Sequence, residues 1–174
     1  MAPIISTGLE AKIYANYYKE LFASFVHAFR NAADHGIEMP EERLCVGKPE
    51  EGHLYLSVQE FEKDNHDWVR ITLKDDGGGI DPHIIKSKMN SEKTKGLSDH
   101  EIIQLIFEDG FSSKDEVSDF SGRGVGMSAI KYEAEAIGGK VWVDSTLGKG
   151  TTLTLEIPNI SKPLSFDQDR VLAS

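Results

Sequence analysis

Residues 68–81 read WVRITLKDDGGGID. Apolar and polar side chains alternate through residues 68–74, which is typical of a strand with one buried face. The alternation runs directly into Asp75-Asp76 and then into Gly77-Gly78-Gly79. Because glycine lets a backbone approach a ligand closely and adopt positive φ, we expect this strand to end at a binding site. The alternative is that the glycines form only a flexible turn.

The same alternation occurs in three other segments, residues 53–61, 140–146 and 151–157. The first is separated from 68–74 by a polar turn at 62–67. The other two are joined through Gly148-Lys149-Gly150. We therefore expect the four strands to form two hairpins.

The longest helix is expected over residues 9–35, in one or two pieces, and Gly36 ends it. Its buried stripe is expected to consist of residues at helical spacing, namely Leu21, Phe22, Phe25, Val26, Phe29, Ala32 and Ala33.

Three shorter helices are indicated by their start signals. The N-cap Asp81 and the following Pro82 begin one that runs to about Met89. A capping box at Ser98 begins another that runs to about Glu108. Residues 125–137 form the last, while 38–52 are expected to be a connector and 109–124 a long mobile loop.

The order helix, hairpin, helices, hairpin is typical of an α+β fold, a two-layer α/β sandwich with helices packed on one face of the sheet. The 174 residues are enough for one domain, which we expect over 20–158. We expect residues 1–19 to be a helical lead-in and residues 159–174 to be a polar tail.

The composition of the chain argues against several classes of function. With 19 basic and 29 acidic residues the net charge is −10, which argues against nonspecific nucleic-acid binding. The single Cys45 excludes an internal disulfide and fits a reducing compartment. No apolar run approaches about 18 residues and no secretory signal is visible, so we expect a cytoplasmic protein without direct membrane insertion.

A second glycine cluster, Gly122, Gly124 and Gly126, lies immediately before the helix expected at 125–137. The unpaired N–H groups and positive dipole end of a helix N-terminus favour phosphate. The GxGxxG and GxxxxGK[ST] patterns are absent from the sequence. A nucleotide site here is therefore of another kind.

The first helix carries a polar face beside its apolar stripe. His27, Asn31 and His35 are each four residues apart, so they are expected on one face of the helix. The amide oxygen of Asn31 is a hard ligand of the kind that Mg²⁺ prefers, together with water and phosphate oxygens.

Four boxes occur in a fixed order: HAFRNAADHGIE (27–38), DDGGGID (75–81), IFEDGFSSKDEVSDFSGRGVGM (106–127) and GKGTT (148–152). Together they resemble the ATP-binding domain shared by gyrase, Hsp90, histidine kinases and MutL, the GHKL superfamily with the Bergerat fold. The resemblance covers roughly residues 20–158. It implies a mixed sheet, helices on one face and a mobile ATP lid.

More narrowly, the chain resembles the catalytic domain of CheA-type histidine kinases. At the position of His27 most of the superfamily has Glu. CheA-type kinases resemble this chain in having His there. Three features depart from that pattern: Ser128 replaces a common Asp, residues 1–20 do not resemble dimerisation helices, and the segment after Pro158 does not clearly begin the regulatory domain of CheA. The resemblance therefore implies the kinase chemistry and leaves a role in chemotaxis open.

The resemblance also implies roles for individual residues. Asp75, with Gly77 and Gly79, would accept a hydrogen bond from the adenine amino group. Asn31 would be the ligand of Mg²⁺, and His27 and His35 would act with it at the phosphates. Thr151 would lie under the adenine, near Asp75.

The resemblance places the ATP lid over residues 108–124, with Phe107 and Phe111 in the box that anchors it. The ATP-binding residues beside the phosphates would be Gly122, Arg123, Gly124, Val125, Gly126 and Met127.

The implied activity is transfer of the ATP γ-phosphate to a histidine on a separate phosphotransfer domain, with a response regulator downstream in two-component signalling. The enzyme would be a histidine protein kinase that uses Mg²⁺ and needs an acceptor domain absent from this chain. It would be either free in the cytoplasm or part of a membrane-associated receptor kinase. Three alternatives share the fold: a Ser/Thr kinase of the anti-sigma-factor type, an ATPase of gyrase or MutL type, and a nucleotide-binding module without catalysis.

Overall fold

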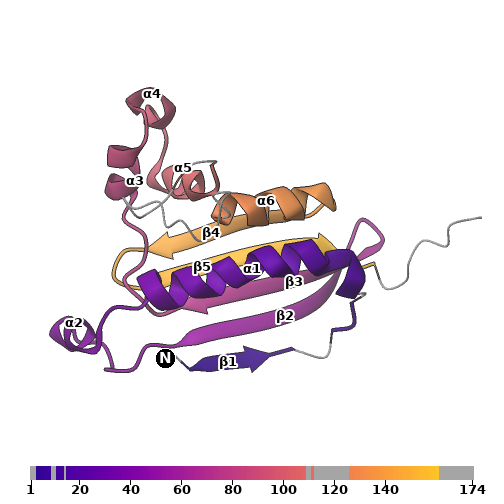
Figure 1. Cartoon of the computed structure of the whole chain (residues 1–174), viewed down its shortest axis with the longest axis horizontal. Helices are drawn as coiled ribbons and strands as arrows, with labels where there is room; N and C mark the ends of the chain where they lie inside the picture. The colour runs from indigo at the N-terminus through magenta and orange to yellow at the C-terminus, as the bar shows by residue number, and fades with distance from the viewer. Residues whose placement is uncertain (1–2, 9–10, 14, 109–110, 112–125, 161–174) are drawn as a thin grey trace, which may run out of the picture.

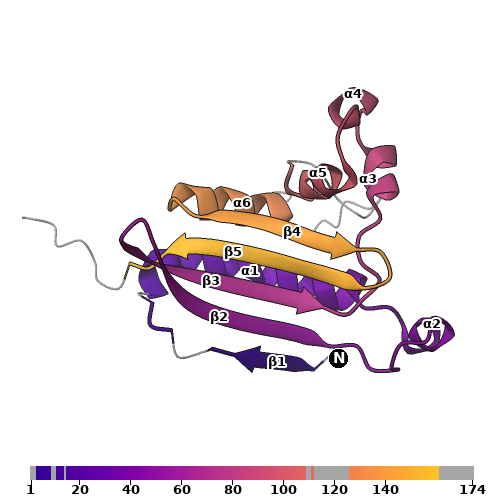
Figure 2. The same ribbon diagram turned by 180° about the vertical axis from the view of Figure 1, so that it is seen from behind.

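The structure is a computed structural model that describes residues 3–8, 11–13, 15–108, 111 and 126–160. Five strands form one sheet in the order β1-β2-β3-β5-β4. The sheet is mixed, because β1 runs parallel to β2 while the other neighbours are antiparallel. Helices α1 and α6 lie on one face, as the two opposite views show (Figures 1 and 2). The predicted α+β sandwich is confirmed.

The first predicted hairpin is formed by β2 (Leu54–Lys63) and β3 (His66–Asp75). Both strands are longer than the alternation predicts, so the turn shrinks to Asp64 and Asn65. These residues have φ of 53° and 60°. A two-residue turn with both φ values positive matches the twist of the paired strands, and Asp and Asn tolerate it well.

The second predicted hairpin is formed by β4 (Lys140–Thr146) and β5 (Gly150–Pro158). Strand β5 also pairs antiparallel with β3, and Lys74 is opposite Thr152 in that register. This pairing brings the end of β3 beside the start of β5. The DDGGG stretch and the GKGTT box therefore meet at one edge of the molecule.

Two elements differ from the sequence prediction. Residues Ile4–Thr7 form an edge strand, β1, where a helical lead-in is expected. Three of these four residues are β-branched, which favours a strand. The expected connector contains helix α2 (Pro40–Cys45), in which Pro40 occupies the first turn and does not break the helix.

The long predicted helix begins later than expected and changes its geometry near its end. A 3-10 turn, η1 (Ala15–Tyr18), leads into α1 (Lys19–Asn31), and a π-turn, η2 (Ala32–Gly36), follows. In the π-turn the backbone N–H of Ile37 donates to the carbonyl of Ala32 at 3.0 Å. The predicted stripe is mostly buried, but Val26 and Ala33 are exposed, which corrects the prediction for both.

Most of the remaining helices lie near the end of the sheet where β3 terminates, and the last one, α6, runs from there along the sheet (Figure 1). They are α3 (Pro82–Lys88), α4 (Ser91–Thr94), α5 (Asp99–Gln104), η3 (Leu105–Phe107) and α6 (Met127–Ala136). The Asp81 carboxylate accepts a hydrogen bond from the His83 backbone at 2.8 Å, which confirms the predicted N-cap. The capping box at Ser98 is also present. Helix α4 carries no periodic signal and is not predicted.

The core lies between the sheet and the helices. It is built from the inward-facing residues of β3 and β5 and from the buried stripe of α1, among them Val69, Ile71, Leu73, Leu155 and Phe25. Each such side chain contributes roughly 1.5–3 kcal/mol on burial. None of the helices in the described ranges is long and apolar enough to cross a membrane.

Candidate nucleotide-binding site

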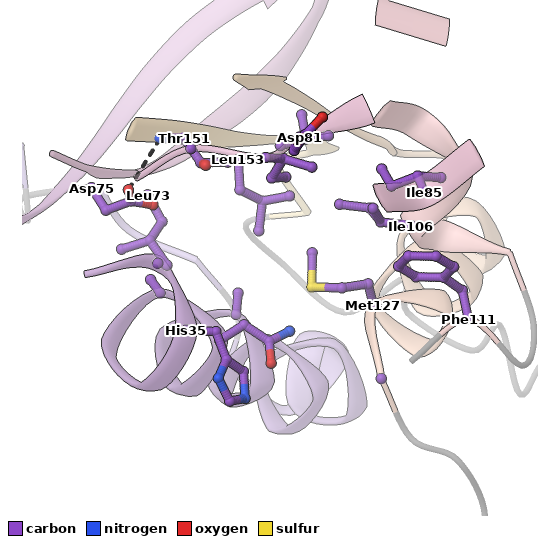
Figure 3. Close-up of a pocket in the computed structure, with 18 of the residues that line it drawn as sticks. His35, Leu73, Asp75, Asp81, Ile85, Ile106, Phe111, Met127, Thr151 and Leu153 are labelled. Carbon is purple, nitrogen blue, oxygen red and sulfur yellow. Dashed lines mark hydrogen bonds between the residues drawn. The ribbon is translucent and has the colours of Figure 1, made fainter. Parts of the chain in front are cut away.

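A cavity of about 400 Å³ lies between the C-terminal end of α1, the ends of β3 and β5, and the α3–α6 region (Figure 3). Its wall contains several residues that the sequence predicts for the site: Asn31, His35, Asp75, Gly79, Gly126, Met127 and Thr151. Segments far apart in the chain therefore meet around one space.

Other predicted site residues lie elsewhere. His27 is half-buried on α1, one turn before Asn31, and is not among the described residues that line the cavity. Gly77 supports the wall from behind and does not line the cavity either. Gly122, Arg123, Gly124 and Val125, and most of the predicted lid, lie outside the described residues.

The π-turn interrupts the predicted polar face of the first helix between Asn31 and His35. A spacing of four residues keeps side chains on one face only in an α-helix. Because the turn from Ala32 to Gly36 is wider, it changes the direction in which His35 leaves the helix. Asn31 and His35 nevertheless both line the cavity, and the role predicted for His27 at the phosphates stays a prediction.

Asp75 lies at the end of β3 with only 4% of its surface exposed. Its Oδ1 accepts hydrogen bonds from the backbone N–H groups of Gly77 at 3.0 Å and Thr151 at 3.1 Å. Figure 3 shows the bond to Thr151 at one end of the cavity. No hydrogen bond within the described part of the chain uses Oδ2 of Asp75, so one carboxylate oxygen remains available for a ligand.

Burial raises the pKa of Asp75, and the negative charges of Asp76 and Glu38 add to this rise. The two backbone hydrogen bonds act in the opposite direction but do not cancel the effect of burial. Perturbed carboxylates in a cleft are common at functional sites. An acceptor that has no cation beside it is suited to a neutral donor such as an exocyclic amine.

Backbone packing at this edge leaves no room for side chains at two positions. A Cβ at Gly77 would lie 1.9 Å from the carbonyl oxygen of Gly36, and one at Gly150 would lie 2.2 Å from that of Asp75. Gly150 also has a φ of 105°. Glycine at 77 therefore allows the loop after β3 to pack against the end of η2.

The opposite end of the cavity is apolar and includes Ile106, Phe111 and Met127 (Figure 3). Gly126 and Met127 are the N-cap and first residue of α6. The first backbone N–H groups of a helix have no partners within it and favour an anion. The cavity thus combines an apolar slot, a carboxylate and a helix N-terminus, which suits a ligand with a flat base and phosphates.

A protein-family model matches residues 20–160, and its description is histidine kinase-, DNA gyrase B- and HSP90-like ATPase. The chain belongs to this ATPase family. The GHKL resemblance that the four sequence boxes indicate is thereby confirmed.

Two curated relatives of this ATPase domain show the narrower similarity. The gliding motility regulatory protein of Myxococcus xanthus is 43% identical over 141 residues, which are 78% of this chain and 18% of the relative. Sensor histidine kinase CheAY of Helicobacter pylori is 39% identical over 161 residues, covering 89% of this chain and 20% of the relative. The chain spans about a fifth of the length of these relatives.

Among solved structures, the catalytic domain of the histidine kinase ThkA is similar to this ATPase domain, with a TM-score of 0.52. The match covers 90% of this chain and 76% of that one, at 18% sequence identity. At this level of identity the likeness shows the shared fold, which agrees with the predicted one.

The donors around the cavity fit Mg²⁺ held mainly by a substrate. Within the described ranges, no group of three or more His, Cys, Asp or Glu side chains is placed to hold a metal. Asn31 is exposed and lines the cavity, so its amide oxygen is accessible there. Mg²⁺ commonly takes one or two protein oxygens and completes its shell with water and phosphates, and Asn31 suits that arrangement.

Several wall residues are not predicted as site residues from the sequence. They are apolar side chains of the strands and of the α3–α5 region, namely Leu73, Ile80, Ile84, Ile85, Val143 and Leu153, together with Asp81. Strand alternation puts Leu73 and Leu153 on the helix-covered face, which is the signal that could have found them. Asp81 is predicted only as an N-cap, a role it also has.

Proposed function

We propose that this chain is the ATP-binding catalytic domain of a CheA-like histidine kinase, which binds Mg-ATP and transfers the γ-phosphate to a histidine on a separate phosphotransfer domain. The observation that carries the proposal is Asp75, a buried carboxylate with one unused oxygen at the end of an apolar slot. The similarity to CheAY supports the same reaction.

In the proposed complex, the adenine lies at the Asp75 end of the cavity, near Thr151 and the apolar side chains of Leu73 and Leu153, and its amino group donates to Oδ2 of Asp75. A charged acceptor for an exocyclic amine discriminates against guanine, which has a carbonyl at that position. The apolar wall excludes water from the base. Asp75 and the slot therefore determine which nucleotide binds.

The phosphates would extend toward Asn31, His35 and the N-terminus of α6, all on the cavity wall. Mg²⁺, when bound with the nucleotide, would offset the negative charge that develops in transfer. Asn31 would supply a metal ligand and His35 a donor to a phosphate oxygen. His27, Gly122, Arg123, Gly124 and Val125 belong to the same proposal through the family resemblance alone.

The proposed step is an in-line displacement at phosphorus. An imidazole nitrogen of the acceptor attacks the γ-phosphorus and an N–P bond forms, while the bond from phosphorus to the bridging oxygen breaks. ADP leaves with the electron pair of that bond, and the imidazole proton passes to solvent. The chain contributes by positioning the γ-phosphate, and a response regulator would accept the phosphoryl group afterwards.

Calorimetric titration with Mg-ATP and Mg-GTP, followed by phosphotransfer from labelled ATP to a purified histidine phosphotransfer domain, tests the proposal. We expect ATP to bind more tightly than GTP. We expect Asn31→Ala to abolish transfer while the thermal unfolding temperature stays unchanged. Asn16→Ala, an exposed change in η1 at the far end of the helix, is the matched control.

Unchanged transfer by Asn31→Ala would refute the metal assignment. Equal affinity for ATP and GTP in the unmodified chain would refute the role of Asp75. Tight ATP binding without transfer to any histidine domain would favour the non-catalytic module, and transfer to a serine or threonine would favour the anti-sigma-factor type.

A further inference from the structure

A cluster of ion pairs around the buried Arg43 lies behind the cavity and takes no part in lining it. Its members are Glu38, Arg43, Lys48 and Asp76, which we call the clamp. Arg43 of α2 is only 1% exposed, and its two terminal nitrogens lie 3.1 Å from Oε2 of Glu38 and 3.2 Å from Oδ2 of Asp76. Lys48 Nζ lies 2.6 Å from Oε1 of Glu38. None of these four residues is among the described residues of the cavity wall.

The two cations of the clamp also hold the backbone of the glycine loop. Arg43 Nη1 donates to the carbonyl oxygen of Asp76 at 3.1 Å. Lys48 Nζ donates to the carbonyl oxygens of Gly77 at 2.7 Å and Asp76 at 3.2 Å. Charged donors form the stronger class of hydrogen bond, so these contacts restrain the peptide units that follow Asp75 directly.

The loop is held from its other side by the end of η2. The backbone N–H of Gly78 donates to the carbonyl oxygen of Gly36 at 2.8 Å. The intervening Gly77 donates to Oδ1 of Asp75, the carboxylate that faces the cavity. Displacement of Gly77 would therefore remove one of the two hydrogen bonds that orient this carboxylate.

The clamp also balances charge beside Asp75. The carboxylates of Glu38 and Asp76 are close enough to raise the pKa of Asp75. Burial acts to raise the pKa of Glu38 and of Asp76, but their hydrogen bonds and the nearby cations of Lys48 and Arg43 outweigh burial, and both pKa values are lowered. Two anions and two cations thus meet behind the loop without a net charge.

We propose that Arg43 and Lys48 are positioning residues for nucleotide selection, which act through the backbone of Asp76 and Gly77 to hold Asp75 in its ligand-ready orientation. The inference rests on the proposed ATP site. It assigns a role to α2 and the segment after it, which contribute nothing to the cavity wall themselves. Adenine affinity accordingly depends on an ion-pair cluster that the ligand never touches.

The first test is Lys48→Met, which keeps the length of the side chain and removes its charge and donors. We expect amide hydrogen exchange at Gly77 and Gly78 to accelerate and the affinity for Mg-ATP to fall about tenfold, because displaced site groups lose most of their contribution. Lys140→Met is the matched control, since Lys140 pairs with Glu156 at 3.4 Å on the other face of the sheet. We expect it to leave both measurements unchanged.

The second test separates positioning from overall stability. Arg43→Met alone leaves the half-buried carboxylates of Glu38 and Asp76 without a shared cation, and we expect it to lower the unfolding temperature. The double variant Glu38→Gln with Arg43→Met removes one charge of each sign and restores the balance. We expect its unfolding temperature to recover most of the loss while its affinity for Mg-ATP stays about tenfold weaker, because the donor to Asp76 is still absent.

Parental ATP affinity in Lys48→Met, or in the folded double variant, would overturn the inference while leaving the ATP site intact. Failure of the unmodified chain to bind ATP would instead overturn the proposed function. In that case the amide hydrogen-exchange rates at Gly77 and Gly78 still show whether the clamp holds the loop, because this measurement is made without a nucleotide. Unchanged exchange in Lys48→Met would refute that contact as well.

Discussion

Asp75 and Glu156 are two buried carboxylates on neighbouring strands of one sheet, and each is 4% exposed. Their surroundings differ. Asp75 faces the helix side and accepts only backbone N–H groups among the described residues. Glu156 faces the other side, where Arg70 Nη2 lies 2.6 Å and Lys140 Nζ 3.4 Å from its oxygens.

Equal burial thus leads to opposite titration behaviour. Burial raises the pKa of Asp75, and nothing cationic touches the carboxylate to reverse it. Burial also acts to raise the pKa of Glu156, but Arg70 and Lys140 outweigh it and the pKa is lowered. A buried carboxylate whose charge is already paired stabilises the fold, whereas one without a cation remains available to a ligand.

The largest effect should come from Asp75→Asn. The Asn amide oxygen can replace Oδ1 as acceptor for Gly77 and Thr151, which places the NH₂ group where Oδ2 faced the ligand. We expect affinity for Mg-ATP to fall about 10- to 100-fold, because a charge-assisted hydrogen bond is replaced by two facing donors. Preference for ATP over GTP should fall as well, since the new donor suits the guanine carbonyl.

Titration calorimetry with both nucleotides measures these effects, and Glu156→Gln serves as the matched control on the paired carboxylate. We expect the control to bind ATP as the parent does. Undiminished ATP affinity in Asp75→Asn would mean that the difference between the two carboxylates has no bearing on ligand binding.

The pH dependence of stability should have opposite signs for the two groups. The pKa of Asp75 in the folded chain lies above its ordinary value of 3.8, so its charge costs stability as pH rises through that interval. The pKa of Glu156 lies below its ordinary value of 4.5, so its ion pairs stabilise above 4.5 and the gain is lost as pH falls through the lowered pKa.

Unfolding temperatures of the parent, Asp75→Asn and Glu156→Gln between about pH 2.5 and pH 7 check these signs. With rising pH, the parent should lose stability relative to Asp75→Asn and gain it relative to Glu156→Gln. Parallel curves for the two variants would show that the cations near Glu156 do not distinguish it from Asp75.

The smallest effect should come from Glu156→Gln at neutral pH. Arg70 and Lys140 have side-chain exposures of 41% and 57%, so both can be hydrated when their partner loses its charge. We therefore expect a loss of only about 1 kcal/mol in the free energy of unfolding. Urea denaturation measures it, and a loss several times larger would indicate that the pair is shielded from solvent.

Local signals in the sequence predict most of the fold. The strand alternation predicts both hairpins, and Asp81 and Ser98 mark the helix starts that the structure has. Strand β1 escapes prediction because four residues are too few to show a period and its pairing with β2 is nonlocal. Helix α2 escapes because Pro40 and the glycines that follow are equally typical of a loop.

Site residues can be predicted from the sequence where the side chain itself has the chemistry that the ligand needs and lies within a recognisable box. Asn31, Asp75 and Thr151 are found from their boxes, and the structure places all three on one cavity wall. His27 lies one α-helical turn before Asn31 and is not among the described wall residues, so its role at the phosphates stays a prediction. The clamp is missed because charged residues in a connector are usually solvated, and no local pattern shows that Arg43 pairs with Asp76, 33 residues further along the chain.

The π-turn from Ala32 to Gly36 makes the site depend on the number of residues as well as on their identity. It accommodates one residue more than an α-helical turn would. Deletion of Ala33 would let the turn close as α and leave the chain beyond it nearly in place, whereas deletion of a residue within α1 would rotate that chain by about 100° with a 1.5 Å shift along the axis. In the second case the Gly36 carbonyl would leave Gly78, and the whole loop behind Asp75 would lose its register with the helix.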